Sequence, residues 1–404
     1  MASEGQSNNE EITKQMLEAC SSGNKEAVLN MLSTHKTKRD LDLSKFNPAS
    51  QQETATGASP LIMAAKAGHI DICKILLEHG SPWNALDKQG KCAGNYASDN
   101  RYQKVVDLLV DAAVKAEFIL GASQRLIRSQ MQTNSRSAPQ SKSPTETPVE
   151  FEPCTKPDYL TTHNVRYNPD QTSLLDDDGD AIMMEWERPL MQAHASMITS
   201  NSTENKKVMN VGFGMGIIDT ILQDEMKPSL HIIIEAHPKV YENMIANGWD
   251  KKPNVRICFG KWQDEIPKLI KEGVTLDGIF FDTYGEHFLD LEDFHEIMVK
   301  LLSKPYGIYS FFNGLAPDNI FFHGVACQCV KLQLSKLGLD TEFVACEIKV
   351  DESAWKGVRR KYWHGDTYYL PICTWNKSFV NDEECNSKRT GEREQKKLKT
   401  DKDS

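Results

Sequence analysis

The sequence lacks the marks of secreted, membrane-spanning and zinc-binding proteins. No apolar run approaches the ~20 residues that a helix needs to cross a bilayer. The first residues are polar and acidic, without the basic and apolar stretches of a secretory signal. Ten cysteines are scattered along the chain without one C-x-x-C pair. We therefore expect an intracellular protein with reduced thiols, no metal site and no membrane association.

Positive charge is also scarce. The chain of 404 residues has 47 Lys and Arg against 57 Asp and Glu, which gives a formal net charge of −10. This balance argues against direct nucleic-acid binding and fits a basic partner better. The hydrophobic share of 39% and the charged share of 26% are ordinary for two or three globular domains.

The first 120 residues contain an internal repeat with a period of 33 residues. The pattern of residues 57–80 returns when 33 is added to each number, and its Ser-Pro-Leu-Ile-x-Ala core resembles the ankyrin repeat. A weaker upstream copy aligns Gly23 with Gly68, which predicts an insertion near 36–52. Such repeats form either a surface for a protein partner or a cap on the next domain. The sequence leaves both open.

Composition divides the rest of the chain. Residues 129–157 hold five of the 17 prolines and predict a linker, and residues 377–404 predict a charged, disordered tail. We therefore expect an ankyrin-like domain over 1–128 and a second domain over 158–376.

The second domain alternates apolar strands with helical patterns. Strands are predicted at 208–211, 230–235, 255–259, 278–282 and 307–312, and helices at 217–226, 239–248, 262–272, 290–303 and 318–337. This order is typical of a doubly wound α/β sheet that is buried on both faces. Two later strands, at 342–350 and 367–375, are expected to close one edge as an antiparallel pair.

A glycine-rich loop follows the first strand. Residues 212–216 read Gly-Phe-Gly-Met-Gly, and Glu235 ends the second strand, where a carboxylate can accept hydrogen bonds from ribose hydroxyls. A dinucleotide fingerprint would have glycine where Ile217 stands. The spacing therefore favours S-adenosylmethionine over a dinucleotide, with the latter as the alternative.

Two acidic residues are candidates for the acceptor side. Asp282 ends the fourth strand, and Glu187 lies in an apolar segment before the first strand. Two carboxylates in one cleft would repel each other unless a cation lies between them, and a guanidinium can pair with both. The segment around Glu187 could equally be a capped helix on the sheet. The acidic run 176–180 either steers a basic protein or forms a solvated turn.

Residues from about 159 to 376 resemble guanidinoacetate methyltransferase. The matching motifs are Met184-Glu185-Trp186-Glu187, Val211-Gly212-Phe213-Gly214-Met215, Ile233-Ile234-Glu235, Gly260-Lys261-Trp262 and the run from Asp277 to Tyr284. With the ankyrin-like N-terminus, the chain resembles the type IV protein arginine N5-methyltransferase family. That resemblance implies a Rossmann-like methyltransferase domain that methylates the internal δ nitrogen of a protein arginine.

The resemblance also implies roles for individual residues. Glu187 and Asp282 match the carboxylates that hold the guanidino group. The residues that match the S-adenosyl-L-methionine site, or adjoin those that do, are Tyr167, Met183, Met191, Gly212, Phe213, Gly214, Met215, Gly216, Ile217, Glu235, Ala236, His237, Lys261, Trp262 and Asp282. The implied substrate is a ribosomal large-subunit protein, and the implied location is the cytoplasm and nucleus.

The chain also departs from known patterns near the acceptor. After Tyr284 the small-molecule enzyme has a proline-led lid, whereas this chain reads Gly-Glu-His-Phe, in which His287 is either a base or a surface residue. The two-glutamate loop of terminal-nitrogen arginine methyltransferases is not reproduced in 282–291. Two alternatives stay open: a methyltransferase for a free guanidino compound, and a non-catalytic ankyrin interaction protein.

Overall fold

The computed structural model describes residues 2–34, 46–134, 159–200, 204–284 and 288–380. The chain divides into two compact units, which we call the repeat unit (1–140 and 316–329) and the sheet unit (141–315 and 330–404). Most of the predicted linker and tail, and His287, lie outside the described residues. Among the helices in these ranges, none combines the length and the apolar character that a bilayer crossing requires.

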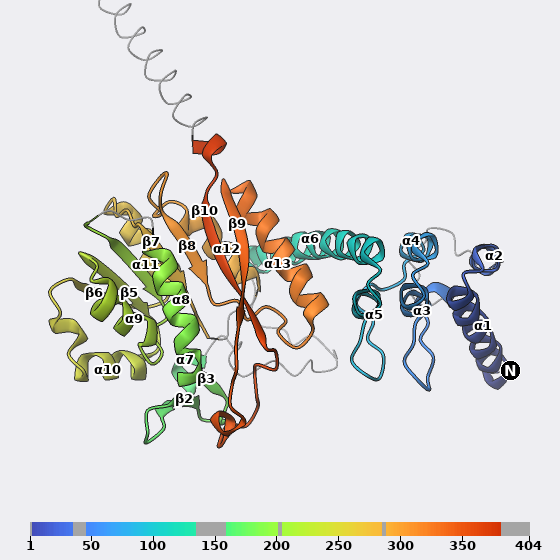
Figure 1. The fold of residues 1–404 in the computed structure, drawn as a ribbon, viewed down its shortest axis with the longest axis horizontal. Coiled ribbons are helices and arrows are strands. Elements are labelled where there is room, and N and C mark those ends of the chain that lie inside the picture. The colour runs from blue at the N-terminus through green and yellow to red at the C-terminus, as the bar shows by residue number, and fades with distance from the viewer. Residues whose placement is uncertain (1, 35–45, 135–158, 201–203, 285–287, 381–404) are drawn as a thin grey trace, which may run out of the picture. The chain divides into compact units, whose positions relative to one another are not determined.

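The repeat unit is built from helices that follow one another in pairs (Figure 1). They are α1 (Ala2–Ser22), α2 (Lys25–Thr34), α3 (Pro60–Lys66), α4 (Ile70–Glu78), α5 (Ala93–Asp99) and α6 (Gln103–Asn134). The turns inside successive pairs repeat one conformation, since Gly23 and Gly68 both have φ near +77° and Arg101 has φ +61°. A Cβ on Gly23 would lie 2.7 Å from the ring of His69. The predicted alignment of Gly23 with Gly68 is therefore seen in the backbone.

The repeat unit differs from the predicted domain in two respects. Helix α6 continues to Asn134, past the boundary predicted at 128. In addition, residues 316–329 group with the repeats although the sequence places them in the second domain. Phe321, Val325 and Cys329 from that segment are buried in the same hydrophobic core as the repeat helices. Helix α13 (Ile320–Lys336) therefore begins in the repeat unit and ends in the sheet unit.

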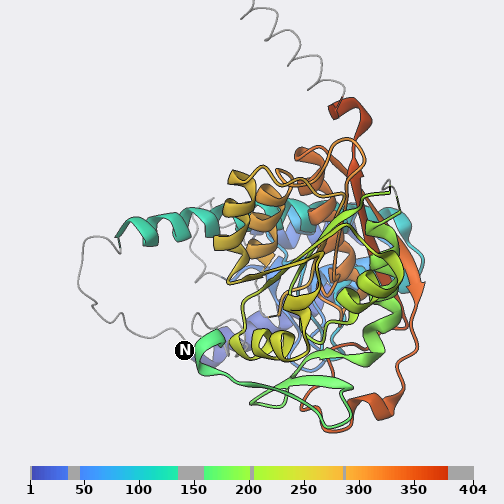
Figure 2. The same ribbon diagram turned by 90° about the vertical axis from the view of Figure 1, so that its left-hand side faces the viewer.

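The sheet unit has a seven-stranded sheet with the order β6-β5-β4-β7-β8-β10-β9. Figure 2 shows the same ribbon turned by 90° from the view of Figure 1. The strands are β4 (Lys207–Val211), β5 (Leu230–Glu235), β6 (Val255–Phe259), β7 (Gly278–Phe281), β8 (Ile308–Phe311), β9 (Leu339–Glu347) and β10 (Thr367–Trp375). The first five are parallel, and β10 runs antiparallel to both β8 and β9. The doubly wound sheet and its antiparallel edge pair were both predicted.

Both faces of this sheet are buried at its centre, because the strands β4, β5, β7 and β8 are apolar at most positions. Ile232 and Ile234 of β5 pack in one hydrophobic cluster, and Ile233 between them packs in another. The covering helices are α8 (Arg188–Ile198), α9 (Ile217–Ile221), α10 (Pro238–Ala246), α11 (Trp262–Lys271), α12 (Phe288–Met298) and part of α13. A π-turn, Leu222–Met226, continues α9.

A second, three-stranded antiparallel sheet precedes the large one and was not predicted. It consists of β1 (Val165–Tyr167), β2 (Ser173–Asp176) and β3 (Ala181–Met184), after the short helix α7 (Tyr159–Thr162). β3 leads through the 3-10 turn Glu185–Glu187 directly into α8. The segment around Glu187 is therefore a strand, a turn and a helix start. In the acidic turn beyond β2, Asp180 forms an ion pair with Arg359, so part of that run has a structural partner.

Candidate active site

The candidate site lies at the carboxyl ends of β4, β5 and β7. From β4 the chain proceeds to β5 and β6 on one side of the sheet and then to β7 and β8 on the other. Such a reversal leaves a crevice outside the strand ends, where open α/β sheets bind ligands. The glycine-rich loop, Glu235 and Asp282 each directly follow or end one of these strands. The sequence-predicted site residues of the three strands are therefore brought to one edge.

The glycine-rich loop needs its glycines because it passes close to other backbone. Gly212 has φ +94°, and a Cβ there would lie 1.9 Å from the carbonyl oxygen of Asp282. Gly216 has φ +69°, and its Cβ would lie 2.4 Å from the ring of Phe213. A side chain at Gly212 would displace the loop from the Asp282 backbone, and one at Gly216 would displace the Phe213 ring. The loop and the acidic residue are thus held against each other.

Glu235 is tied to this loop by backbone hydrogen bonds. The N–H of Phe213 donates to Oε2 at 2.9 Å, and the N–H of His237 donates to Oε1 at 2.6 Å. Burial raises the pKa of Glu235, and these N–H donors act in the opposite direction. Each carboxylate oxygen has a second lone pair. Glu235 can therefore hold the loop and still accept a hydrogen bond from a ligand hydroxyl.

A buried polar network of Asn210, Asp219 and His231 contacts the start of the loop. It was not predicted from the sequence. The side-chain amide of Asn210 donates to the Gly212 carbonyl at 2.9 Å and to Asp219 Oδ2 at 2.8 Å. His231 Nε2 lies 3.0 Å from Asp219 Oδ1, and both side chains are fully buried. Hydrogen bonds between buried polar groups favour a single arrangement. The network fixes the Gly212 carbonyl at the start of the loop.

Glu187 and Asp282 form a pair of acidic side chains at the acceptor side. Glu187 ends the 3-10 turn after β3 and is only 3% exposed. Asp282 follows β7, and its Oδ2 atom is buried without a hydrogen-bond partner. Burial, with the nearby charge of Asp282, raises the pKa of Glu187 to about 8, and burial raises the pKa of Asp282 to about 7. Buried carboxyls in this state are suited to a cationic ligand.

The chain is similar to known methyltransferases and ankyrin-repeat proteins. The family model for guanidinoacetate N-methyltransferase matches residues 151–317, and a model for ankyrin repeats in three copies matches residues 16–118. Protein arginine N-methyltransferase 2 of Yarrowia lipolytica is 40% identical over 54% of this chain and 47% of its own, about half of each. The protein of the same name from Emericella nidulans is 34% identical over 75% of this chain and 77% of its own.

The chain belongs to the protein arginine N-methyltransferase 2 family. Membership confirms the methyltransferase and ankyrin parts of the resemblance seen in the sequence. Among solved structures, spermidine synthase from Thermotoga maritima covers 52% of this chain and 68% of its own. It is 14% identical to this chain, with a TM-score of 0.38.

Several other predicted residues of this family member contact the loop. The Tyr167 hydroxyl donates to the Gly214 carbonyl at 2.9 Å, and the Met215 N–H lies 3.3 Å from the Met183 sulfur. The remaining predicted residues do not share these contacts. Met191 and Trp262 are buried in the hydrophobic clusters of the two sheet faces, the His237 ring caps α10, Ala236 is partly buried, and Lys261 is exposed at the start of α11. Their roles at a cofactor stay predictions.

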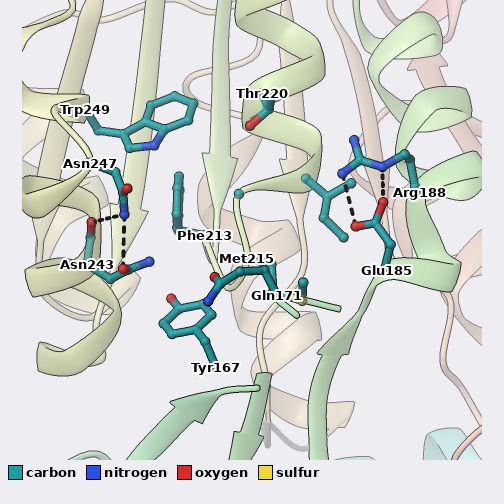
Figure 3. A pocket seen from close by; sticks show the side chains of 12 residues that line it. Tyr167, Gln171, Glu185, Arg188, Phe213, Met215, Thr220, Asn243, Asn247 and Trp249 are labelled. Carbon is teal, nitrogen blue, oxygen red and sulfur yellow. Dashed lines mark hydrogen bonds and ion pairs between the residues drawn. The ribbon is translucent and has the colours of Figure 1, made fainter. Parts of the chain in front are cut away.

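A cavity of about 300 Å³ lies on the loop (Figure 3). It is lined by five predicted residues, Tyr167, Phe213, Met215, Gly216 and Ile217, together with Gln171, Glu185, Arg188, Thr220, Asn243, Asn247 and Trp249. Glu187, Glu235 and Asp282 do not line it. The cavity and the acidic residues therefore occupy different parts of the loop's surroundings.

Sequence reasoning missed the aromatic residues around Glu187. The Tyr362 hydroxyl donates to Glu187 Oε1, and Trp355 packs against both Trp186 and Tyr362. Tyr368 of β10 accepts a hydrogen bond from the Asn313 N–H at 2.7 Å. The available signal was the concentration of five aromatic residues between 355 and 369. Five aromatic residues so close in sequence indicate an aromatic cluster, but they do not reveal that it contacts Glu187.

Proposed function

We propose that this chain transfers a methyl group from S-adenosylmethionine to the δ nitrogen of an arginine in a protein, with a ribosomal large-subunit protein as the expected substrate. The observation that carries the proposal is the pair of buried carboxyls, Glu187 and Asp282, beside the glycine-rich loop. The names of the relatives support arginine as the acceptor. The family resemblance supports the δ nitrogen.

The loop side of the site fits the cofactor. Gly212 lets the loop pass directly against the Asp282 carbonyl, and Glu235 keeps lone pairs for ribose hydroxyls while its oxygens accept hydrogen bonds from the N–H groups of Phe213 and His237. The loop lacks the third glycine with which a dinucleotide fingerprint packs helix against strand. When bound, S-adenosylmethionine supplies an electrophilic methyl group on its sulfonium.

The carboxylates of Glu187 and Asp282 would bind and orient the acceptor. A guanidinium has a pKa above ~12 and is a poor nucleophile until charge is drawn away from the reacting nitrogen. Carboxylates that accept hydrogen bonds from the terminal N–H groups of the guanidinium localise positive charge on the terminal nitrogens. The internal nitrogen is then left to react. One carboxylate then takes the proton that the nitrogen loses as the new bond forms. Fixed orientation in a buried site can contribute several kcal/mol to lowering the barrier.

Mass spectrometry of the methylated product tests the proposal. The full chain would be incubated with isotopically labelled S-adenosylmethionine and a ribosomal protein extract. Fragmentation of the labelled arginine distinguishes a methyl group on the δ nitrogen from one on a terminal nitrogen, and we expect the δ product. A terminal product would contradict the acceptor geometry but keep the cofactor. An absence of label would favour a non-catalytic ankyrin protein or a small-molecule acceptor.

A free guanidino compound is the second candidate acceptor. It is favoured by the match of residues 151–317 to the guanidinoacetate N-methyltransferase model. The discriminating measurement is turnover of guanidinoacetate by the same enzyme preparation. Turnover comparable to that of the protein extract would favour the small-molecule activity. We expect the protein substrate to be preferred by a large margin.

A further inference from the structure

The hydrogen bonds at Glu187 are unevenly shared between its two oxygens. The backbone N–H of Met184 donates to Oε1 at 2.9 Å, and the Tyr362 hydroxyl donates to the same Oε1. Both hydrogen bonds that the described residues show at this carboxyl therefore end on one atom. Oε2 is the oxygen left for another donor. At the neighbouring Asp282, Oδ2 is buried without a partner.

Tyr362 is held in place by an aromatic cluster, which we define as Trp186, Trp355, Tyr362 and Trp363. The ring of Tyr362 lies edge-on to Trp355, with centroids 5.1 Å apart, and tilted against Trp186 at 5.7 Å. Trp363 is tilted against Trp186 at 6.4 Å. Aromatic pairs in these arrangements stabilise one another. The Tyr362 hydroxyl is therefore directed at Glu187 by packing from several sides.

We propose that Tyr362 is a positioning residue for the acceptor, which orients Glu187 so that Oε2 faces the guanidinium beside Asp282 Oδ2. The inference rests on the proposed arginine methylation, because it assigns the free oxygens to that acceptor. A hydroxyl donor also favours the ionised carboxylate over the neutral acid. Tyr362 thus has two effects on Glu187: it selects the oxygen that binds, and it keeps the charge that attracts the cation.

Three titratable groups bear on Glu187, and each comes from a different element. Asp282 after β7 disfavours the Glu187 charge, and the Tyr362 hydroxyl favours it. Tyr368 of β10 feels the charges of both carboxyls, but its hydroxyl is hydrogen-bonded to Asn313 and lies 2.9 Å from His194. Burial and the Glu187 charge raise the pKa of Tyr362 well above its ordinary value. Tyr362 therefore remains a donor throughout the neutral pH range.

The test is the variant Tyr362→Phe, compared with Tyr309→Phe as the matched control. Tyr309 is also a buried tyrosine with a hydrogen-bonded hydroxyl, 3.0 Å from His295, but it belongs to the core of the sheet unit. Initial rates would be measured with saturating labelled S-adenosylmethionine and a fixed, subsaturating amount of ribosomal protein extract. At subsaturating acceptor these rates report kcat/KM for the acceptor, and their pH profile reports the ionisation of the enzyme before the acceptor binds, with S-adenosylmethionine already bound.

We expect Tyr362→Phe to shift the rising limb of this profile to higher pH. Each unit of displacement would lower the rate at pH 7 by about tenfold and leave the rate at high pH less affected. The Kd of S-adenosylmethionine, from calorimetry, should stay unchanged, and Tyr309→Phe should keep the wild-type profile. A rate loss that is equal at every pH, or no loss, would overturn the proposal.

Failure of the proposed function gives a different result. If the wild-type product carries its methyl group on a terminal nitrogen, the acceptor chemistry is wrong, while the pH shift still tests Tyr362. If no acceptor is labelled, carbon-13 NMR of the full chain with carboxyl-labelled glutamate follows the Glu187 titration, with Glu187→Gln to identify the signal. Tyr362→Phe should raise its midpoint. An unchanged midpoint would overturn the proposal without reference to activity.

Discussion

At the residue scale, Asp282 carries a carboxyl group where its charge is costly to the folded protein. Burial raises the pKa of Asp282 to about 7, against ~3.9 for a free aspartate. The folded state therefore binds a proton more tightly than the unfolded state. By linkage, the stability due to this group is fully present below about pH 4 and is lost as pH rises to about 7. A bound cation, such as the guanidinium of the proposed acceptor, would offset this cost.

The variant Asp282→Asn should therefore be more stable than the wild type but inactive. An uncharged amide of the same shape removes the ionisation cost, so we expect a higher Tm at pH 8, by roughly 2–4 °C per kcal/mol of stabilisation. The gain should shrink at pH 5, where folded wild type is largely protonated. Thermal unfolding at both pH values, with methyl transfer measured in parallel, checks this. An equal Tm difference at pH 5 and pH 8 would contradict the buried charge.

Glu235 should act on the cofactor rather than on the acceptor. We expect Glu235→Ala to weaken S-adenosylmethionine binding by tenfold or more, since it removes an acceptor for ribose and leaves the N–H groups of Phe213 and His237 without their partner. Glu187→Ala, as the matched variant, should largely keep cofactor binding and abolish transfer. Calorimetric titration of both variants measures this. The assignment of Glu235 to the cofactor and Glu187 to the acceptor would be reversed if Glu187→Ala lost cofactor binding and Glu235→Ala kept it.

The aromatic environment of Glu187 could not be predicted, although Glu187 itself was. Tyr362 is 175 residues away in sequence and lies on a segment between β9 and β10 that has no regular pattern. Glu187 was found because a family motif surrounds it. No local rule connects Tyr362 to that motif, since the contact arises only when β10 and the turn after β3 pack together.

At the scale of elements, the positions of buried strands were predicted more accurately than those of exposed or very short strands. The five parallel strands were predicted to within one residue at each end, because all but β6 are largely buried on both faces and apolar at most successive positions. β9 was placed three residues too late, since it is an edge strand in which exposed and buried residues alternate irregularly. The sheet β1-β2-β3 was missed because its strands have only three or four residues. Segments this short show no usable period, and β1 and β2 contain polar residues that interrupt an apolar run, unlike most positions of the equally short β7 and β8.

The glycine-rich loop allows a prediction at the same scale. Gly212→Ala should destabilise the sheet unit by about 3 kcal/mol or more, because its Cβ would meet the Asp282 carbonyl at 1.9 Å in a left-handed backbone conformation. Gly273→Ala is the matched control, since Gly273 has φ +74° with nothing within 4 Å of its Cβ. It should cost only about 1–2 kcal/mol.

Urea unfolding followed by tryptophan fluorescence measures this difference. Six of the seven tryptophans belong to the sheet unit, so the signal reports mainly on that unit. Calorimetry with S-adenosylmethionine adds a second readout, in which Gly212→Ala should lose binding and Gly273→Ala should keep it. Equal unfolding free energies for the two variants would show that the loop can move away from Asp282.

At the scale of the whole molecule, no single boundary in the sequence separates the two units, since each unit contains two segments of the chain. The sequence predicts a boundary at the Pro-rich linker, yet residues 316–329 belong with the repeats. The start of α13 reads Ile-Phe-Phe-His-Gly-Val-Ala-Cys. This apolar run fits the core of either unit equally well, so its sequence could not show which core it joins. The repeat unit is thus completed by residues that follow Asp282 of the sheet unit in the chain.

A variant at Phe321 can test whether residues 316–329 complete the hydrophobic core of the repeat unit. It is 6% exposed, it lies in the hydrophobic core of the repeats, and its ring fills the space beside Gly94 of α5. Phe321→Ala should destabilise the repeat unit by about 3–5 kcal/mol. Ile320→Ala, one residue earlier and 58% exposed, should stay within about 0.5 kcal/mol of wild type.

Hydrogen exchange of the amides in α5 and α6 measures the two variants in the full chain. Exchange reports the free energy of local opening, so it isolates the repeats from the rest of the protein. We expect faster exchange in α5 and α6 for Phe321→Ala and wild-type exchange for Ile320→Ala. If both variants protected these amides as well as the wild type, residues 316–329 would not support the repeats. A repeat fragment that ends at residue 140 would then be expected to fold with full stability, whereas the present structure predicts that it lacks part of its core.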